Sequence, residues 1–383
     1  MFKNALSSVA GAAGVIAILT LISRGFGFVR TVGESWALGA TPIADAYSAA
    51  NNVPNILFEI VAGGALAGVV VPLISGFLVR GQSRDLSQTV SALLTWVLVV
   101  SVPVALGVVA LSRPIASFIL PSGTEATVDL AAFMLTVFAV QVPLYGLSIV
   151  ATGVLQAHRR FVLPALAPLL SSLVVIATFA LYWNVAGAGA HDPTAVPRGA
   201  IALLAWGTTG GVAAFSLPQL LPLLRLTRLR PTFRFPAGIA RRAASMAGAG
   251  FGGLLAQQAA IVATMVVANS AGGEGTFPIF KYAQAIYFLP YAILSVPIAT
   301  ALYPRISERA AADNPVGLGS LVAGSIRAII AVSAIGGAAL VAAAPQVTIV
   351  FSRVYNMVEL TDTLTVLAVG VIGYSLLLSL IHI

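Results

Sequence analysis

The chain has no cysteine and only three histidines. The lack of cysteine excludes disulfide bonds, thiol nucleophiles and metals bound through thiolates. His158, His191 and His382 stand far apart and no HExxH pattern occurs, so the sequence predicts no metal site. It also lacks a phosphate-binding GxxxxGKS/T loop and a convincing Ser/His/Asp arrangement. We therefore expect a protein that is not an enzyme and holds no resident cofactor.

Charge is scarce as well. Charged residues make up 8% of the 383 residues, whereas a soluble domain has about 25%. Hydrophobic residues make up 59%, and the mean hydropathy is +0.99. Most of the surface of such a chain cannot face water, which excludes a soluble enzyme, a disordered chain and a nucleic-acid-binding domain. Repeated apolar stretches of the ~20 residues that cross a bilayer predict an all-α polytopic membrane protein.

About ten apolar stretches are long enough to span a membrane. They cover roughly residues 4–29, 45–79, 87–111, 127–154, 162–184, 199–224, 243–269, 277–303, 317–343 and 363–383. The first is too long for a signal peptide and no cleavage site follows it, so we expect it to be retained. The last runs to Ile383 without a charged or aromatic flank, which predicts a C-terminally truncated chain.

Basic and acidic residues occupy alternate loops. One set of loops contains Lys3, Arg80, Arg84, Arg159, Arg160, Arg225, Arg228, Arg230, Arg234, Arg241, Arg242, Arg305 and Arg309. The other set carries most of the acids: Glu34, Glu125, Asp129, Asp192, Glu274, Glu359 and Asp362. Because Lys and Arg mark cytoplasmic loops, we expect a cytoplasmic N-terminus. The net charge of +8 then reports orientation in the membrane and does not point to nucleic acid.

The longest basic stretch, residues 225–242, divides the chain. Six predicted spans precede it and four follow, which predicts an N-terminal lobe at 1–224, a basic cytoplasmic linker at 225–242 and a partial C-terminal lobe at 243–383. Such a linker either lies on anionic headgroups or docks a cytoplasmic partner.

Two arginines, Arg24 and Arg30, stand at the end of the first span, with Gly25 and Gly27 between them. Arg24 follows Lys3 by roughly the 31 Å that crosses the hydrocarbon core, so it either snorkels to the outer interface or lines a polar cavity. The planar guanidinium suits phosphate groups, because it forms bidentate charge-assisted bonds. If the two arginines line a polar cavity, we expect them to bind a phosphate as a pair.

Three more ionisable residues fall in or near spans. Asp45 either stabilises the start of a helix, because its negative charge interacts favourably with the helix dipole, or it pairs with Arg24, Arg30 or a coupling ion. Glu59 lies about 14 residues into the second span, where a carboxylate must be paired, protonated or hydrated, so we expect it to face a cavity. Lys281 either marks the outer end of a span or supplies a third cation to that cavity.

Arg24, Arg30 and Asp45 belong to motifs that resemble the MurJ/MviN family of the multidrug/oligosaccharidyl-lipid/polysaccharide exporter superfamily. The motifs are Ser23-Arg24-Gly25-Phe26-Gly27-Phe28-Val29-Arg30, Leu38-Gly39, Asp45-Ala46-Tyr47 and Val53-Pro54-Asn55-Ile56-Leu57. Further echoes occur at Val71-Pro72, Phe161–Ala165, Ala167-Pro168 and Pro304–Ser307. The resemblance covers most of the chain and is specific in the first 75 residues. With only two lysines among its 20 basic residues, the composition resembles that of an actinobacterial member.

The resemblance implies about fourteen helices in two lobes around a cationic cavity. It implies a flippase of the bacterial cytoplasmic membrane for lipid II, the undecaprenyl-pyrophosphate-linked peptidoglycan precursor. Arg24 and Arg30 match the family's first-helix arginines, candidates for the pyrophosphate, and Asp45 matches its acid at the start of the second helix. Asn55 belongs to the matched Pro-Asn motif. Substrate-binding candidates are thus Arg24, Arg30, Asp45, Asn55, Glu59 and Lys281.

The chain also departs from the family pattern. Phe58 and Glu59 stand where many members have arginines, Gly63-Gly64-Ala65 replaces a Glu-Gly-Ala motif, and Gln284-Ala285 replaces an Asp-Arg pair. A cavity with fewer cations and an added carboxylate keeps open an ion-coupled drug or other polyprenyl-lipid exporter. A membrane scaffold that does not transport is a third reading. The energy source, a coupling ion or the membrane potential, also stays open.

Overall fold

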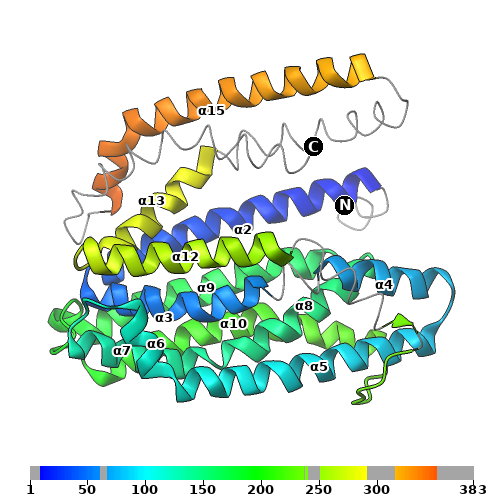
Figure 1. The fold of residues 1–383 in the computed structure, drawn as a ribbon, viewed down its shortest axis with the longest axis horizontal. Helices are drawn as coiled ribbons and strands as arrows, with labels where there is room; N and C mark the ends of the chain where they lie inside the picture. The colour runs from blue at the N-terminus through cyan, green and yellow to red at the C-terminus, as the bar shows by residue number, and fades with distance from the viewer. Residues whose placement is uncertain (1–8, 61–66, 237, 240–250, 291–314, 352–383) are drawn as a thin grey trace. The chain divides into compact units, whose positions relative to one another are not determined.

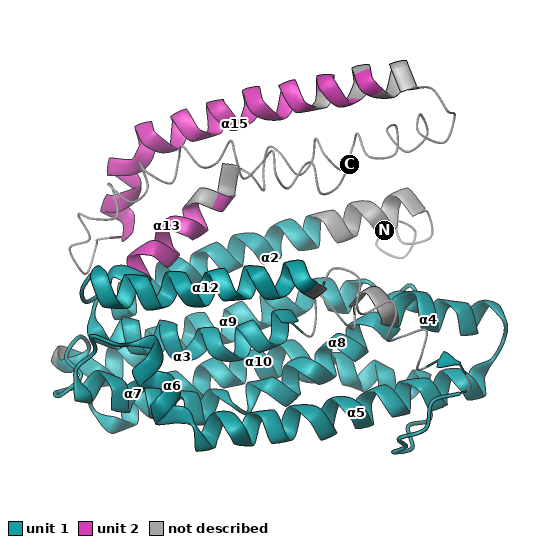
Figure 2. Cartoon of the chain, viewed as in Figure 1, with its two compact units in different colours: residues 1–277 teal, residues 278–383 magenta. Residues whose placement is uncertain are grey.

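A computed structural model describes residues 9–60, 67–236, 238–239, 251–290 and 315–351 (Figure 1). The predicted all-α membrane fold is confirmed in this part of the chain. It divides into two compact units, residues 1–277 and 278–383 (Figure 2). The lobe boundaries expected around the 225–242 linker stay a prediction.

Twelve α-helices and one short 3₁₀ turn make up the described part. The helices are α2 (Val9–Leu38), α3 (Pro42–Glu59), α4 (Ala67–Val79), α5 (Ser83–Ala110), α6 (Ser112–Ile119), α7 (Glu125–Phe138), α8 (Gln141–Ala157), α9 (Val162–Ala186), α10 (Arg198–Leu226), α12 (Phe251–Ala271), α13 (Thr276–Pro290) and α15 (Pro315–Phe351). The 3₁₀ turn η2 (Gly187–Gly189) follows α9.

Six stretches of the described residues are long and apolar enough to cross a membrane. They are Ser83–Ala110, Glu125–Ala157, Val162–Ala186, Arg198–Leu226, Gly252–Ala271 and Val322–Phe351. Each overlaps a span predicted from the sequence. The chain is thus a multi-pass membrane protein, while the expected total of about ten spans reaches beyond the described residues, since 363–383 lies outside them.

The first span extends further than its apolar run suggests. The sequence predicts an end near Val29 and places Glu34 in a loop, but α2 continues to Leu38. Glu34 and Ser35 are buried there, and Ser48 of α3 donates a hydrogen bond of 3.3 Å to Glu34 Oε1. A polar partner inside the bundle therefore keeps an acidic residue within the helix.

Small residues allow α9 and α10 to pack closely, and α9 also packs against α2. Gly207 and Gly211, four positions apart, lie on the face of α10 that meets α9. A Cβ atom on Gly211 would lie 2.5 Å from Val175 Cγ2, and one on Gly207 would overlap Thr178. This is the small-xxx-small spacing by which membrane helices approach each other.

Polar side chains join α8 to α10 inside the bundle. Gln141 Nε2 donates to Thr209 Oγ1 at 3.2 Å, and Thr152 Oγ1 donates to Gln219 Oε1 at 2.6 Å. Such bonds stabilise helix pairs in a medium that offers no water.

The loops of the first unit gather at two ends. Basic loops after α4, α8 and α10 surround one cavity, lined among others by Arg84, His158 and Arg228. At the acidic end, Arg113 forms ion pairs with Glu125 at 3.0 Å and Asp129 at 2.9 Å. The alternation of charge along the sequence therefore corresponds to a separation in space within this unit.

The second unit contains α15 and most of α13. Ring centroids of Tyr282 and Phe351 lie 6.0 Å apart, and both side chains are buried. Lys281 stands half-buried beside Tyr282 on α13.

Candidate functional site

Arg24 and Arg30 lie on different faces of α2. Six residues of an α-helix correspond to a rise of about 9 Å and a rotation that leaves the two side chains about 120° apart. Arg24 is exposed, whereas Arg30 is half-buried. Beside Arg24, Ser23 is buried and donates a hydrogen bond of 2.8 Å to the carbonyl of Ala165. The structure thus brings Arg30, and not Arg24, toward the interior of the first unit.

Arg30 lies within electrostatic reach of two tyrosine hydroxyls, those of Tyr47 and Tyr145. Glu34, one turn further along α2, accepts a hydrogen bond from the Ser48 hydroxyl. In the described part of the chain both ion pairs belong to Arg113, so no carboxylate there neutralises Arg30 at ion-pair distance. A half-buried guanidinium with no carboxylate at ion-pair distance among the described residues favours an anionic ligand.

Asn55 contributes to the same surroundings from α3. Its Oδ1 accepts a hydrogen bond of 3.0 Å from the Tyr145 hydroxyl, and its Nδ2 donates to the carbonyl of Asn51 at 2.8 Å. Glu59, the last residue of α3, is exposed and also within electrostatic reach of Tyr145. Tyr145 therefore bonds to Asn55 and lies within electrostatic reach of two more predicted site residues, Arg30 and Glu59.

An aromatic trio, Phe58, Tyr145 and Phe215, adjoins these polar groups. Its rings come from α3, α8 and α10, with centroids 4.5 Å apart for Phe58–Tyr145 and 6.3 Å for Tyr145–Phe215. We call Arg30, Tyr47, Asn55, Glu59 and Tyr145 the polar cluster. An apolar aromatic wall beside a cation and hydrogen-bonding groups suits an amphiphilic ligand with an anionic head.

Asp45 is separate from this cluster. It is buried in the first turn of α3, whose start is explained by Thr41, since Thr41 Oγ1 accepts a hydrogen bond of 3.3 Å from Ala44 N. Asp45 Oδ2 accepts a bond of 2.6 Å from the backbone amide of Gly275. Its other oxygen, Oδ1, has no hydrogen-bond partner in the described part of the chain. Asp45 therefore joins α3 to the segment after α12.

Lys281 belongs to the second unit, so its relation to the polar cluster stays a prediction. The motif Gly63-Gly64-Ala65 lies outside the described residues. Of the predicted set, the structure gathers Arg30, Asn55 and Glu59.

Two residues of this region escaped prediction as site residues. Tyr145 stands alone in an apolar run, where an aromatic residue signals only packing or an interface. Tyr47 belongs to a matched motif, but its role depends on α10: its hydroxyl lies 3.1 Å from Thr208 Oγ1. Because Thr208 already donates to the Leu204 carbonyl, Tyr47 is the donor. Both contacts join residues far apart in sequence, so no local pattern could reveal them.

The sequence matches the family model "Lipid II flippase MurJ" over residues 35–382. A lipid II flippase MurJ from Burkholderia cenocepacia is 31% identical over 304 residues, which cover 76% of this chain and 55% of that relative. A probable lipid II flippase MurJ from Rhizobium meliloti is 27% identical over 313 residues, covering 77% and 54%. The chain thus spans about half the length of the curated relatives it matches.

Solved structures show the same fold. A lipid II flippase MurJ in an inward closed conformation superposes with a TM-score of 0.79 at 17% identity, covering 96% of this chain and 74% of the other. An inward-facing multidrug resistance MATE family transporter superposes with a TM-score of 0.70 at 17% identity, covering 95% of this chain and 87% of the transporter. At these identities the likeness concerns the fold alone, whereas the family model matches most of the sequence. The chain belongs to the lipid II flippase MurJ family.

Proposed function

We propose that this chain moves a lipid-linked peptidoglycan precursor, lipid II, across the bacterial cytoplasmic membrane by alternating access. The observation that carries the proposal is Arg30: a half-buried guanidinium on α2, without a carboxylate at ion-pair distance in the described residues. A diphosphate supplies the missing negative charge, and the guanidinium fork binds it in two places. The names of the relatives support the choice of substrate.

The parts of the polar cluster have different tasks in this proposal. Arg30 binds the diphosphate, with Asn55 and the Tyr145 hydroxyl as hydrogen-bonding neighbours. Arg24 and Lys281 add positive charge along the path of the headgroup. Glu59 and Asp45 adjust the charge or bind a coupling ion, since carboxylates in a membrane are costly unless they have such a role.

Rescue of a bacterium depleted of its own lipid II flippase tests the activity. We expect the 383-residue chain to restore growth and the Arg30→Ala variant to fail, although both reach the membrane in equal amounts. Failure of the unsubstituted chain, properly inserted, would reject the flippase activity. Equal rescue by both would reject Arg30 as the binding residue.

An ion-coupled exporter is a second candidate. The observations that favour it are the aromatic trio and the exposed Glu59, which suit a cationic aromatic compound. Efflux of ethidium from cells that express the chain would support this candidate. Efflux that persists in Glu59→Gln, or none at all, would count against it.

The orientation is part of the proposal: the N-terminus and the 225–242 linker lie in the cytoplasm, where the linker meets headgroups or a protein partner. Because the chain has no cysteine, single cysteines report sidedness without background. The exposed Arg160 and Ala195 flank α9. We expect an impermeant maleimide added to intact cells to label Ala195→Cys and not Arg160→Cys. The reverse pattern would overturn the orientation.

A further inference from the structure

The chain after α10 runs along the side of α5, extended from Arg228 to Thr232 and bent at Phe233. We call residues 227–236 the strap. Five side chains of α5 form hydrogen bonds with its backbone. Three of them donate to carbonyl oxygens: Ser87 Oγ to Arg228, Trp96 Nε1 to Phe233 (3.2 Å) and Gln88 Nε2 to Arg234 (3.0 Å). Two accept from backbone amides: Ser91 Oγ from Arg230 N (3.0 Å) and Thr95 Oγ1 from Thr232 N (3.2 Å).

The spacing of these bonds follows from backbone geometry. The α5 partners Ser87, Ser91 and Thr95 recur every fourth residue, a rise of about 6 Å on a helix. Their strap partners recur every second residue, a rise of about 6.6 Å in an extended chain. The two repeats match from Arg228 to Thr232, so this part of the strap keeps register with α5, and after a bend at Phe233 the Arg234 carbonyl returns to Gln88. In an extended chain every second side chain points the same way, and Arg228, Arg230 and Thr232 all line one cavity.

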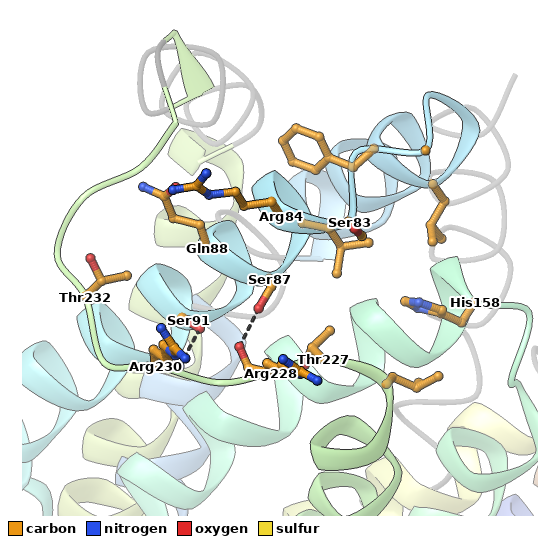
Figure 3. Close-up of a pocket in the computed structure, with 15 residues that line it drawn as sticks. Ser83, Arg84, Ser87, Gln88, Ser91, His158, Thr227, Arg228, Arg230 and Thr232 are labelled. Atoms are coloured by element: carbon orange, nitrogen blue, oxygen red, sulfur yellow. Dashed lines mark hydrogen bonds between the residues drawn. The ribbon is translucent and has the colours of Figure 1, made fainter.

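This cavity, the basic pocket, has a volume of about 780 Å³. The strap forms one wall, the first turns of α5 form another and His158 closes a third side (Figure 3). The polar side chains of Ser87, Gln88 and Ser91 lie between the arginines; Ser91 and Gln88 keep a proton to donate, whereas Ser87 donates its proton to the Arg228 carbonyl. Apolar residues of α4 and α5, Phe77 and Leu86, form part of the lining and belong to the hydrophobic core below.

The basic pocket carries uncompensated positive charge. Arg84, Arg228 and Arg230 line it, and in the described part of the chain none of them forms an ion pair with a carboxylate. Asp85 follows Arg84 on α5 but is not part of the lining. The 28-residue helix α5 begins at the pocket without a side-chain cap, so backbone amides of its first turn lack a side-chain partner, while Asp85 in that turn offsets part of the positive end of the helix.

His158 adds a further nitrogen. Its Nδ1 lies 2.8 Å from the Val154 carbonyl, which can only accept, so Nδ1 carries a proton. Nε2 is then the ring nitrogen left to contact a ligand.

We propose that the basic pocket binds a phosphate-bearing anion, at a site separate from the polar cluster. Three guanidinium groups, hydroxyl and amide donors and a helix N-terminus form the donor set that phosphate prefers. The volume exceeds that of one phosphate and suits a whole headgroup or a small phosphate ester. The same chemistry is offered by an anionic phospholipid at the membrane boundary and by a soluble phosphate, and the experiment separates them.

The test uses the full chain, purified in detergent. One arm titrates inorganic phosphate by calorimetry. The other measures retention of dioleoyl phosphatidic acid against dioleoyl phosphatidylcholine by native mass spectrometry. Binding of phosphatidic acid alone identifies a lipid headgroup, and binding of inorganic phosphate identifies a soluble ligand class. If neither probe binds, the proposal is wrong.

Two double variants with equal loss of charge decide where binding occurs. Arg228→Gln with Arg230→Gln removes two of the three pocket arginines but keeps the strap, because its bonds use backbone atoms at those residues. Arg160→Gln with Arg234→Gln removes two exposed arginines that do not line the pocket. We expect the first to weaken binding about tenfold or more and the second to stay within about twofold.

Equal weakening in the two double variants would show nonspecific attraction and overturn the proposal. Arg84→Gln, on α5, is an independent third variant in case the first does not fold, and size-exclusion chromatography checks the folding of all of them. Unchanged binding in Arg84→Gln would also reject the pocket.

Discussion

The backbone amide of Gly275 donates a hydrogen bond of 2.6 Å to Asp45 Oδ2, joining two residues 230 positions apart in the sequence. The φ of Gly275 is +81°, in the region that favours glycine. A Cβ atom there would lie 2.6 Å from the carbonyl oxygen of Ala40. The loop after α12 can therefore reach the start of α3 only with glycine at this position.

Gly275→Ala should lower stability by about 2 kcal/mol, because the new methyl group meets Ala40 and the residue keeps a positive φ. Gly273→Ala is the matched control: its φ is +79°, but nothing lies within 4 Å of its Cβ position. Thermal unfolding in detergent, followed by tryptophan fluorescence, measures both. Equal midpoints for the two variants would contradict the close contact.

Substitutions of Asp45 separate its structural task from its charge. Asn retains an oxygen that accepts the Gly275 bond, whereas Leu leaves a buried amide without an acceptor. We expect Asp45→Leu to lose about 1–3 kcal/mol of stability and Asp45→Asn to lose less. Lipid transport should fall in both variants if the negative charge acts in coupling. Full transport by a stable Asp45→Asn would show that the residue serves the fold alone.

The approach of α9 and α10 depends on small residues. Gly211→Leu should separate the two helices and cost about 1–3 kcal/mol, since Val175 occupies the space beyond its Cα. Gly199→Leu, on the same helix with nothing within 4 Å of its Cβ position, is the control. Thermal unfolding compares them, and a midpoint for Gly211→Leu at or above that of the control would refute the packing.

The side chains of α5 should protect the strap from proteolysis. Ser91→Ala with Thr95→Val removes the acceptors for the amides of Arg230 and Thr232. We expect tryptic cleavage after Arg228 and Arg234 to accelerate about tenfold, because cleavage follows the population of the released segment. Ser83→Ala, which removes no strap bond, should cleave at the original rate. No acceleration in the double variant would mean that these bonds do not retain the strap.

The sequence predicted the all-α membrane fold and most span positions, because hydropathy and helix length are local properties. Its error at Glu34 has a physical cause. Acids mark loops on average, but Ser48 of α3 supplies a buried partner that extends α2 beyond the apolar run. The helix thus ends where its polar partners end, which hydropathy does not report.

The site was only partly predictable. Arg30 was predicted because a charge in an apolar span is costly and conspicuous. Tyr145 was not predicted because its contact is with Asn55, 90 positions earlier. The strap register depends on α5 residues about 140 positions away from their partners, so the sequence showed its arginines but not the cavity they line.

The central claim is that Arg30 binds the diphosphate during transport. The most direct measurement is the rate at which the purified chain moves a fluorescent lipid II analogue across a vesicle bilayer. We expect Arg30→Ala to lower this rate about tenfold or more through loss of a charge-assisted bond, and Arg30→Lys to keep part of it. Arg113→Ala, which breaks an ion-paired surface arginine, should retain the full rate. A correctly inserted Arg30→Ala that moves the lipid as fast as the unsubstituted chain would contradict the claim.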